Sequence, residues 1–180
     1  MKPIVQQEAP VLRQMAKPVP EALFGTDDLA RIIADMAETL DAEPDGVAIA
    51  APQIGTAYRI FIVRTYRTLP PPPDGAPAHA PHNDVYINPE IVKTSRRRQQ
   101  ADEGCLSVRG IYGTTDRHER VTVKAKREDG STFTRGGGGL LAQIFEHEID
   151  HLNGVLFIDH ATDLVHARPS HVTDLPDHVA

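Results

Sequence analysis

The chain has 180 residues, which is enough for one domain that buries roughly two-thirds of the surface of its unfolded chain. Its net charge of −6 argues against general binding to DNA, and no apolar run approaches the about 18 residues of a membrane-spanning helix. Residues 1–8 have neither the hydrophobic core of a secretory signal nor the composition of a transit peptide, so the expected location is the cytoplasm. A single cysteine excludes an internal disulfide and favours a reducing compartment.

The first predicted element is a helix over residues 28–40. Candidate N-caps precede an apolar stripe at helical spacing, and Pro44-Asp45-Gly46 ends the element; the stripe consists of Leu29, Ile32, Ile33, Met36 and Leu40. The segment GVAIAAPQIG (46–55) follows. Its small side chains let another backbone approach closely, and Gln53 offers an amide donor in an otherwise apolar run. The same pattern also fits a packed core strand that ends in a Pro/Gly turn.

Short runs of β-forming residues predict strands in the rest of the chain, at 59–63, 85–87, 91–94, 111–114, 121–126, 132–134 and 155–158. Residues 121–126 alternate as an antiparallel strand with one exposed face should, and Glu128–Ser131 supplies a hairpin turn. The proline-rich stretch 69–82 predicts a surface insertion with polyproline II character. Arg96–Arg98 is read as a charged solvated loop, or else as a contact to ribosomal RNA. Gly136–Gly139 is expected to be a flexible approach to the next helix.

Cys105 lies within the segment EGCLS (103–107). A lone cysteine is often a buried inert thiol, but Gly104 before it permits an unusual backbone conformation and Leu106 after it is an apolar anchor. A thiolate is also a good ligand for a metal ion, provided that further ligands lie nearby.

The segment HEIDH (147–151) supplies such ligands. Two histidines four residues apart lie on one face of a helix, so His147 and His151 can reach the same ion. Glu148 projects beside that ion and can take a proton from bound water. The flanking apolar residues predict a helix that stops at Asn153-Gly154.

A catalytic metal site usually has a third protein ligand. An H-E-x-x-H-x-x-G-x-x-H protease would need histidine at position 157, which is Phe157, and no glutamate follows Glu148. Downstream candidates remain at Asp159, His160 and Asp163. Cys105 is the preferred third ligand because a thiolate and two imidazoles leave one tetrahedral position open for water.

The chain resembles the peptide deformylase family, which carries three such segments in the same order. Here they are GVAIAAPQ (46–53), EGCLS (103–107) and HEIDH (147–151), and the resemblance extends over about residues 10–160. The predicted strands and helices add up to an α+β fold with antiparallel strands wrapped around a central metal-binding helix, and the resemblance implies the same fold. Length and composition divide the chain into one catalytic domain (1–160), with the insertion at 69–82, and a polar, partly disordered tail (161–180).

The resemblance also implies the reaction, which is removal of the formyl group from N-formylmethionine at the start of new polypeptides, with release of formate. One divalent ion would be held by Cys105, His147 and His151; it is Fe(II) by resemblance, and Zn, Ni or Co are possible in the isolated protein. Glu148 would be general base and then acid, and Gln53 and the Leu106 N–H would stabilise the oxyanion. Zinc suits this ligand set, so the ligands alone leave the metal open.

Other roles follow from the same resemblance. The expected substrate-binding residues are Val47, Ala48, Ile49, Gly104, Leu140 and Ile144. The first three would form a strand that pairs with the peptide, and the side chains of Ile49, Leu140 and Ile144, with the edge of His147, would form the methionine pocket. Residues that hold the ligands in place are expected to be Glu103, Arg117 and Asp150. The chain departs from the family at Ala48, where the family has its second glycine, and at Glu146, where it usually has glutamine.

The expected partners are N-formylmethionyl peptides and nascent chains, with a transient contact to the ribosome, and neither DNA nor membrane. Two alternatives remain. One is a metal-dependent amidase or peptidase that acts on another acyl group, which Ala48 would permit. The other is a non-catalytic paralogue that binds nascent chains or ribosomes.

Overall fold

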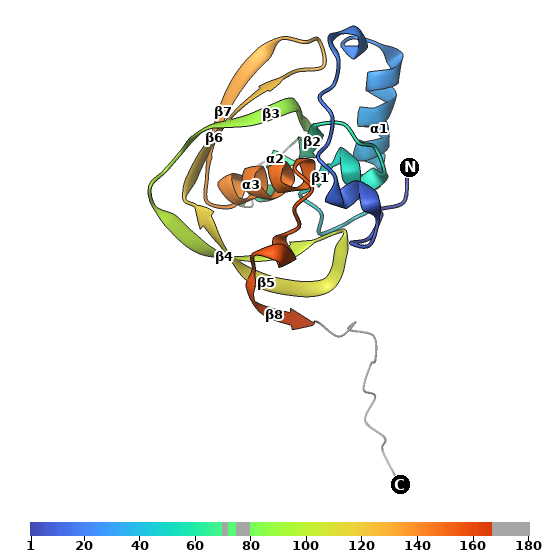
Figure 1. Ribbon diagram of the computed structural model, residues 1–180. Coiled ribbons are helices and arrows are strands. Elements are labelled where there is room, and N and C mark those ends of the chain that lie inside the picture. Colours follow the sequence, from blue (N-terminus) through green and yellow to red (C-terminus); the bar gives the residue numbers. More distant parts are fainter. Residues whose placement is uncertain (70–71, 75–79, 167–180) are drawn as a thin grey trace.

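A computed structural model describes residues 1–69, 72–74 and 80–166, and it shows two antiparallel sheets around one central helix (Figure 1). The predicted α+β class is therefore confirmed. Within these ranges, no helix has the length and apolar character needed to cross a membrane.

The larger sheet has five strands in the order β1-β2-β3-β6-β7, and the smaller has three in the order β4-β5-β8. The strands are β1 (Ala48–Ala50), β2 (Ile60–Val63), β3 (Asp84–Thr94), β4 (Arg98–Cys105), β5 (Val108–His118), β6 (Arg120–Lys126), β7 (Thr132–Gly138) and β8 (Thr162–His166). The short strand β1 pairs with β2 alone, so it forms one edge of the larger sheet.

Two longer helices accompany the sheets. The helices are α1 (Asp27–Asp41), α2 (Thr65–Thr68) and α3 (Leu140–Leu152), and the 3₁₀ turns are η1 (Pro10–Arg13), η2 (Glu21–Leu23), η3 (Ala51–Ile54) and η4 (Phe157–Asp159). Helix α1 begins where the Thr26 hydroxyl accepts a hydrogen bond from the Leu29 N–H, as an N-cap should. Its apolar stripe, including Met36 and Leu40, is buried against β1 and β2.

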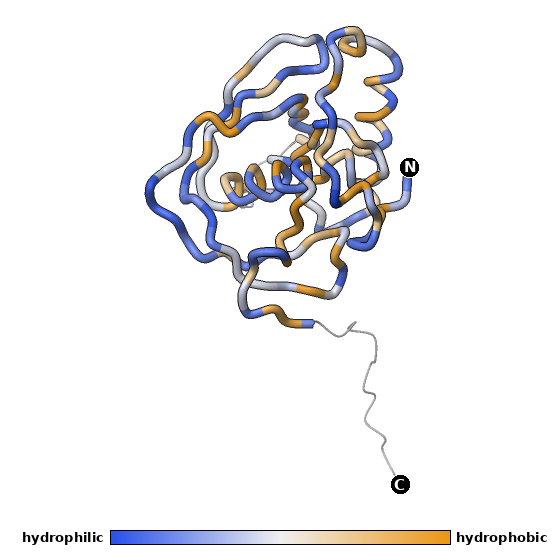
Figure 2. The backbone as a smooth tube through the Cα atoms, in the orientation of Figure 1, coloured by the Kyte–Doolittle hydropathy of each residue, from blue (hydrophilic) through white to orange (hydrophobic). Residues whose placement is uncertain are grey.

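Helix α3 is the centre of the fold and contacts strands of both sheets (Figure 1). Figure 2 shows hydrophobic residues on α3 and the strands near it, and hydrophilic residues on the outer ribbon of β3 and β4. Phe145 is fully buried, with its ring centroid 5.3 Å from that of Tyr86 and 6.3 Å from that of Phe61. This aromatic packing fixes the helix two residues before the HEIDH segment, which therefore has a rigid support.

Several predicted strands differ from the observed ones. Residues 155–158 do not form a strand; Leu156 and Phe157 are buried, but the chain continues into η4. A short apolar run that is buried does not reveal its backbone conformation, which explains the wrong prediction. The strands predicted at 85–87 and 91–94 are parts of β3, joined through register shifts near Asn88. Strand β4 was not predicted, because its sequence RQQADEGC has no alternating apolar residues.

Two further segments are more regular than the sequence indicated. Gly136–Gly138 belong to β7 and pair with β6, so they are not a flexible approach to α3. Residues Thr162–His166 of the predicted tail form β8, which pairs with β5. The remaining tail residues 167–180, and residues 70–71 and 75–79 of the predicted insertion, lie outside the described ranges.

Candidate metal centre

Three side chains that can bind a metal meet between the smaller sheet and α3. Cys105 lies at the end of β4, and His147 and His151 lie one turn apart on α3; their ligand atoms are all within 4.8 Å of one another. The Cys105 Sγ is 3.2 Å from Nε2 of His151. These are the three ligands that the sequence predicted, and a single ion can reach all of them.

The alternative third ligands lie elsewhere. The Asp159 carboxylate accepts hydrogen bonds from Arg13 (2.6 Å) and from the Leu156 N–H (2.8 Å). The His160 Nε2 is 3.4 Å from Asp150. Among the described residues, only Cys105 and the two histidines of α3 form a cluster suited to a metal ion.

A buried ion pair supports the first histidine. Nδ1 of His147 contacts the Glu103 carboxylate, which leaves Nε2 as the nitrogen available to an ion. Arg117 donates to both Glu103 oxygens, at 3.1 and 2.8 Å, and to Asp150 at 2.7 Å. Burial alone would raise the pKa of Glu103, but the hydrogen bonds from His147 and Arg117 hold that pKa well below its usual range. Glu103 is therefore an anion that orients the His147 ring.

Glu148 faces the same space from α3. Its side chain is buried, and its Oε2 has no hydrogen-bond partner within the described part of the chain. Burial raises the pKa of Glu148 to about 7, with the charge of Glu103 adding to the effect and His147 opposing it. A buried carboxyl group with an unpaired oxygen and a pKa near neutrality is suited to accept and release protons.

Gln53 approaches from the other side, on η3. Its Oε1 accepts a hydrogen bond from the Ala50 N–H at 2.8 Å, which fixes the orientation of the amide. The Nε2 is thereby turned towards the Cys105 Sγ (3.6 Å) and the Ser107 Oγ (3.2 Å). Because Oε1 is occupied, the group that Gln53 presents to the centre is a donor.

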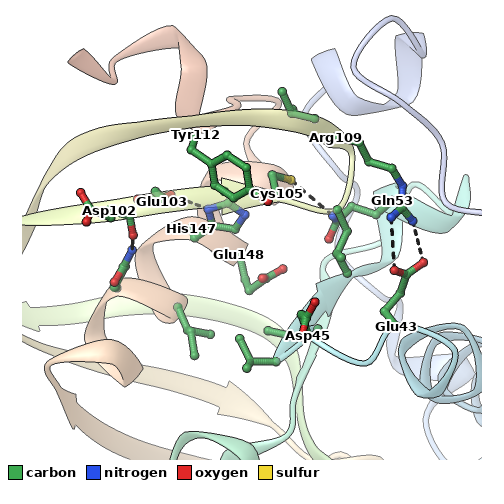
Figure 3. Close-up of a pocket in the computed structure, with 18 of the residues that line it drawn as sticks. Glu43, Asp45, Gln53, Asp102, Glu103, Cys105, Arg109, Tyr112, His147 and Glu148 are labelled. Carbon is green, nitrogen blue, oxygen red and sulfur yellow. Dashed lines mark hydrogen bonds and ion pairs between the residues drawn. The ribbon is translucent and has the colours of Figure 1, made fainter. Parts of the chain in front are cut away.

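A pocket of about 430 Å³ opens onto this centre (Figure 3). Its walls are the α1–β1 loop with β1, the β4–β5 hairpin, and the first half of α3. Most of the predicted substrate-binding residues line it, namely Val47, Ala48, Gly104, Leu140 and Ile144, and so does Leu106, which was predicted to stabilise the oxyanion. The prediction for the Ile49 side chain is wrong: it does not line the pocket and is fully buried against α1, because successive side chains of a strand point to opposite faces.

The backbone of β1 also borders the pocket. The Val47 C=O accepts from the Arg64 N–H, which continues the β1–β2 ladder to residue 47. In an antiparallel ladder the intervening residue directs its N–H and C=O away from the partner. The N–H and C=O of Ala48 therefore point away from β2, on the open side of this edge strand.

Glu146, a departure from the family pattern, does not add charge to the pocket. Its carboxylate accepts hydrogen bonds from the His118 backbone N–H (2.8 Å) and contacts the His118 ring Nδ1 (2.7 Å), on the side of β5. It is absent from the pocket lining.

Several lining residues carried no sequence signal. Arg109 forms two hydrogen bonds with Glu43 (2.6 and 3.3 Å) between the β4–β5 hairpin and the α1–β1 loop, and Tyr112 borders the cavity. Ser107, beneath the centre, donates its N–H to the Cys105 Sγ at 3.4 Å. Ser107 belongs to the EGCLS segment and is not part of the pocket lining, whereas Arg109 and Tyr112 reach the pocket through strand pairing that sequence alone does not reveal.

Comparisons with known proteins match nearly the whole chain to a single family. A family model described as polypeptide deformylase matches residues 1–167. A peptide deformylase from Brucella suis is 38% identical over 164 residues, covering 91% of this chain and 86% of that protein. One from Dehalococcoides mccartyi strain CBDB1 is 41% identical over 157 residues, covering 87% and 84%.

Solved structures show the same similarity. A class I type b peptide deformylase from Acinetobacter baumannii with Met-Ala-Ser bound has a TM-score of 0.77 at 34% identity, over 89% of this chain and 99% of that one. A peptide deformylase from Thermotoga maritima has a TM-score of 0.76 at 35% identity, over 90% and 98%.

Proposed function

The chain belongs to the polypeptide deformylase family, it removes the formyl group from the N-terminus of new polypeptides, and we propose that it does so at the centre formed by Cys105, His147 and His151. The observation that carries this assignment of residues is the convergence of β4 and α3, which brings a thiol and two imidazoles to one point beside the buried Glu148.

The residues present fit a divalent metal ion. The Cys105 thiolate and the two imidazole nitrogens would hold the ion and leave room for a water, and the Glu103 carboxylate that contacts His147 fixes its tautomer. When bound, the ion lowers the pKa of its water towards about 7 and polarises the substrate carbonyl. We assign Fe(II) on the basis of the family, and zinc, nickel or cobalt can occupy the same ligand set in isolated protein.

Glu148 moves the proton in this proposal. Its carboxylate accepts a proton from the attacking water, and the same group then donates that proton to the departing amine, so formate and a free N-terminus result. Burial supports both halves of this role, because a pKa of about 7 makes the protonated and ionised forms comparable at neutral pH.

Gln53 stabilises the developing charge. Attack on the formyl carbon places negative charge on its oxygen, and the fixed Nε2 donor faces the position next to Cys105. We assign the N–H of Leu106, which lines the pocket, as the second donor on the basis of the family. A donor that is held in place before the reaction costs no reorganisation during it.

The peptide binds along β1 in this proposal. Its backbone adds to the free edge at Ala48, and the methionine side chain occupies the apolar part of the pocket that Leu140 and Ile144 border. Ala48 adds a methyl group at this edge, in the place of a family glycine, which keeps the substrate backbone further from β1 than a glycine would.

We further infer that the protein acts in the cytoplasm, where nascent chains carry the formyl group, and contacts the ribosome transiently. Exposed Arg96 and Arg97, in the turn between β3 and β4, support a contact with RNA, whereas Arg98 is engaged with Asp116. Co-sedimentation of the protein with ribosomes, compared with an R96A/R97A variant, tests the contact; equal binding of both proteins would exclude this turn.

Formate release tests the assigned residues. Protein purified without oxygen and analysed for metal should release formate from formyl-Met-Ala. Cys105→Ala should lose bound metal and activity together, whereas Glu148→Gln should keep the metal and lose activity by at least about 100-fold. Val92→Ala, on the exposed part of β3, is the control and should behave as the wild type.

The same assay separates the alternatives. Faster hydrolysis of acetyl-Met-Ala than of formyl-Met-Ala would indicate an amidase of other specificity. Full activity of Glu148→Gln would refute the assigned base, and a biological effect that persists in this inactive variant would favour a binding protein.

A further inference from the structure

One ion pair joins two walls of the pocket and has no part in the proposed chemistry. Arg109, near the start of β5, donates a hydrogen bond to each carboxylate oxygen of Glu43, at 2.6 and 3.3 Å (Figure 3). Both residues line the pocket, although they lie 66 residues apart in the chain. The pair therefore connects the β4–β5 hairpin of the smaller sheet with the loop that leads from α1 into β1 of the larger sheet.

The Glu43 side of this pair has a firm support. Arg67 donates to the backbone C=O of Glu43 at 3.0 Å and to that of Gly46 at 2.6 Å, and the Glu43 C=O also accepts the Gly46 N–H at 3.0 Å. A Cβ added to Gly46 would lie 2.7 Å from Cδ1 of Leu40, so the loop packs closely on the last turn of α1. The Glu43 carboxylate is thus held at a fixed place beside the pocket.

The Arg109 side belongs to the wall that faces β1. The hairpin turns where Cys105 pairs with Val108, and Arg109 is the next residue of β5. Val108 is buried, whereas the Arg109 side chain extends to the loop, where Glu43 is its only hydrogen-bonding partner among the described residues. No other ion pair in the described part of the chain links this hairpin to the α1–β1 loop.

The exposure of the two side chains decides how strongly the pair acts. A two-point contact between a guanidinium and a carboxylate is stronger than a single hydrogen bond. However, the side chains of Arg109 and Glu43 are 53% and 21% exposed, so water competes for them and salt screens their charges. The pair can therefore bias the separation of the two walls without locking it. A pocket that already has the right width spends less binding free energy on reorganisation when a peptide enters.

We propose that Arg109 and Glu43 are positioning residues: their ion pair is a clasp that holds the β4–β5 hairpin at its distance from the α1–β1 loop and so prepares the pocket for the peptide backbone. The clasp acts through the two walls and not through contact with the substrate. This inference rests on the proposed function of the same site.

The test uses the peptide formyl-Met-Ala-Ser-amide, which has no carboxylate for Arg109 to bind. In Arg109→Met, which keeps the aliphatic stem, and in Glu43→Gln, KM should rise roughly 2- to 5-fold at low salt with kcat nearly unchanged. The double variant should show no larger rise than either single variant, because both changes remove the same interaction. In about 1 M salt, the KM of the wild type should approach that of the variants.

Two control variants and a second measurement accompany the kinetics. Arg31 and Asp28 form an exposed ion pair on α1 outside the pocket, so Arg31→Met and Asp28→Asn make the same changes in charge and should keep the wild-type KM. Amide hydrogen exchange reports on the wall itself: residues 106–112 should exchange faster in Arg109→Met and Glu43→Gln than in the wild type.

The two single variants separate a clasp from a direct contact with the peptide. If Arg109 bound the peptide, Glu43→Gln would free the guanidinium and lower KM, which is the opposite of the expected result. An unchanged or lower KM in Glu43→Gln, additive effects in the double variant, or unchanged hydrogen exchange would overturn the inference. No formate from the wild-type protein would instead overturn the proposed function.

Discussion

Arg117 and Glu103 form a two-point ion pair whose side chains are only 5% and 3% exposed, and the same carboxylate contacts the ring of His147. The pair joins β5, β4 and α3, so the position of one expected metal ligand depends on a charge that water does not reach. A buried pair is costly to break, because removal of one partner leaves the other charge unsatisfied.

Glu103→Gln should therefore weaken both metal binding and folding. We expect the affinity for the metal to fall roughly 10- to 100-fold and the free energy of unfolding to fall by about 3–5 kcal/mol. Metal titration and denaturant unfolding measure the two effects. Asp150→Asn removes the second, more exposed partner of Arg117, and it should lower the metal affinity and the free energy of unfolding by less than Glu103→Gln does. Wild-type metal affinity in Glu103→Gln would contradict the orienting role.

Glu148 should make the stability of the metal-free protein depend on pH. Its pKa is about 7 in the folded protein and near 4.5 when unfolded, so its contribution is most favourable below pH 4.5 and is lost as the pH rises through 7. Glu148→Gln lacks this ionisation. We expect the variant to match the wild type near pH 4.5 and to be more stable by about 3 kcal/mol at pH 8. Denaturant unfolding in the presence of a chelator measures this; a constant difference across this range would exclude a raised pKa.

Gln53→Ala should reduce kcat without releasing the metal. Loss of one fixed donor to the oxyanion costs about 2.7–4 kcal/mol, or roughly 100- to 1000-fold in kcat. Steady-state kinetics and metal analysis check this. The control is Gln100→Ala, at an exposed position of β4. If KM alone rose in Gln53→Ala, the amide would bind the substrate and not its transition state.

Ala48→Gly tests the methyl group at the peptide-binding edge. We expect a lower KM for formyl-Met-Ala because the backbone of the peptide can approach β1 more closely, and a loss of about 0.5–1 kcal/mol in the free energy of unfolding. Ala50→Gly, in the same strand but outside the pocket lining, should show the loss of stability alone. A KM that does not fall in Ala48→Gly would show that the methyl group leaves the substrate undisturbed.

Gly154→Ala should destabilise the end of the metal-binding helix. Gly154 has φ +77°, and an added Cβ would lie 2.9 Å from the Arg13 carbonyl carbon and 3.0 Å from the Gln14 nitrogen. We expect the free energy of unfolding to fall by roughly 1–3 kcal/mol or more. Gly25→Ala is the control, since Gly25 also has a positive φ but no atom within 4 Å of the added Cβ. Equal losses would mean that backbone conformation, and not the close contact, sets the cost.

The residues of the metal centre were predicted from the sequence more completely than the strands of the two sheets. The helical spacing of His147 and His151 is a local property, so it can be read directly from the sequence. The approach of Cys105 is not local, and it was predicted from the chemistry of a third ligand and then from the family pattern. Strand β4 escaped prediction because its residues face water on one side and polar partners such as Arg117 on the other, so it lacks an apolar period.

The binding pocket was predicted in part for a similar reason. Leu140 and Ile144 share the face of α3 that carries His147, so their place follows from helix geometry. Ile49 was misplaced because its face of β1 depends on the register with β2. Arg109 and Tyr112 could not be found, since only the pairing of β4 with β5 brings them to the cavity.

The position of the lone thiol on β4, opposite two imidazoles on α3, has a mechanical consequence. An ion shared by these residues would tie the three-stranded sheet to the helix that is packed on the five-stranded one, across 46 residues of sequence between Cys105 and His151. Such a tie restricts the unfolded chain as a disulfide does, although the protein has no second cysteine with which to make one. A chelator should therefore lower the unfolding temperature of this protein, as a reductant lowers that of a secreted protein with disulfides.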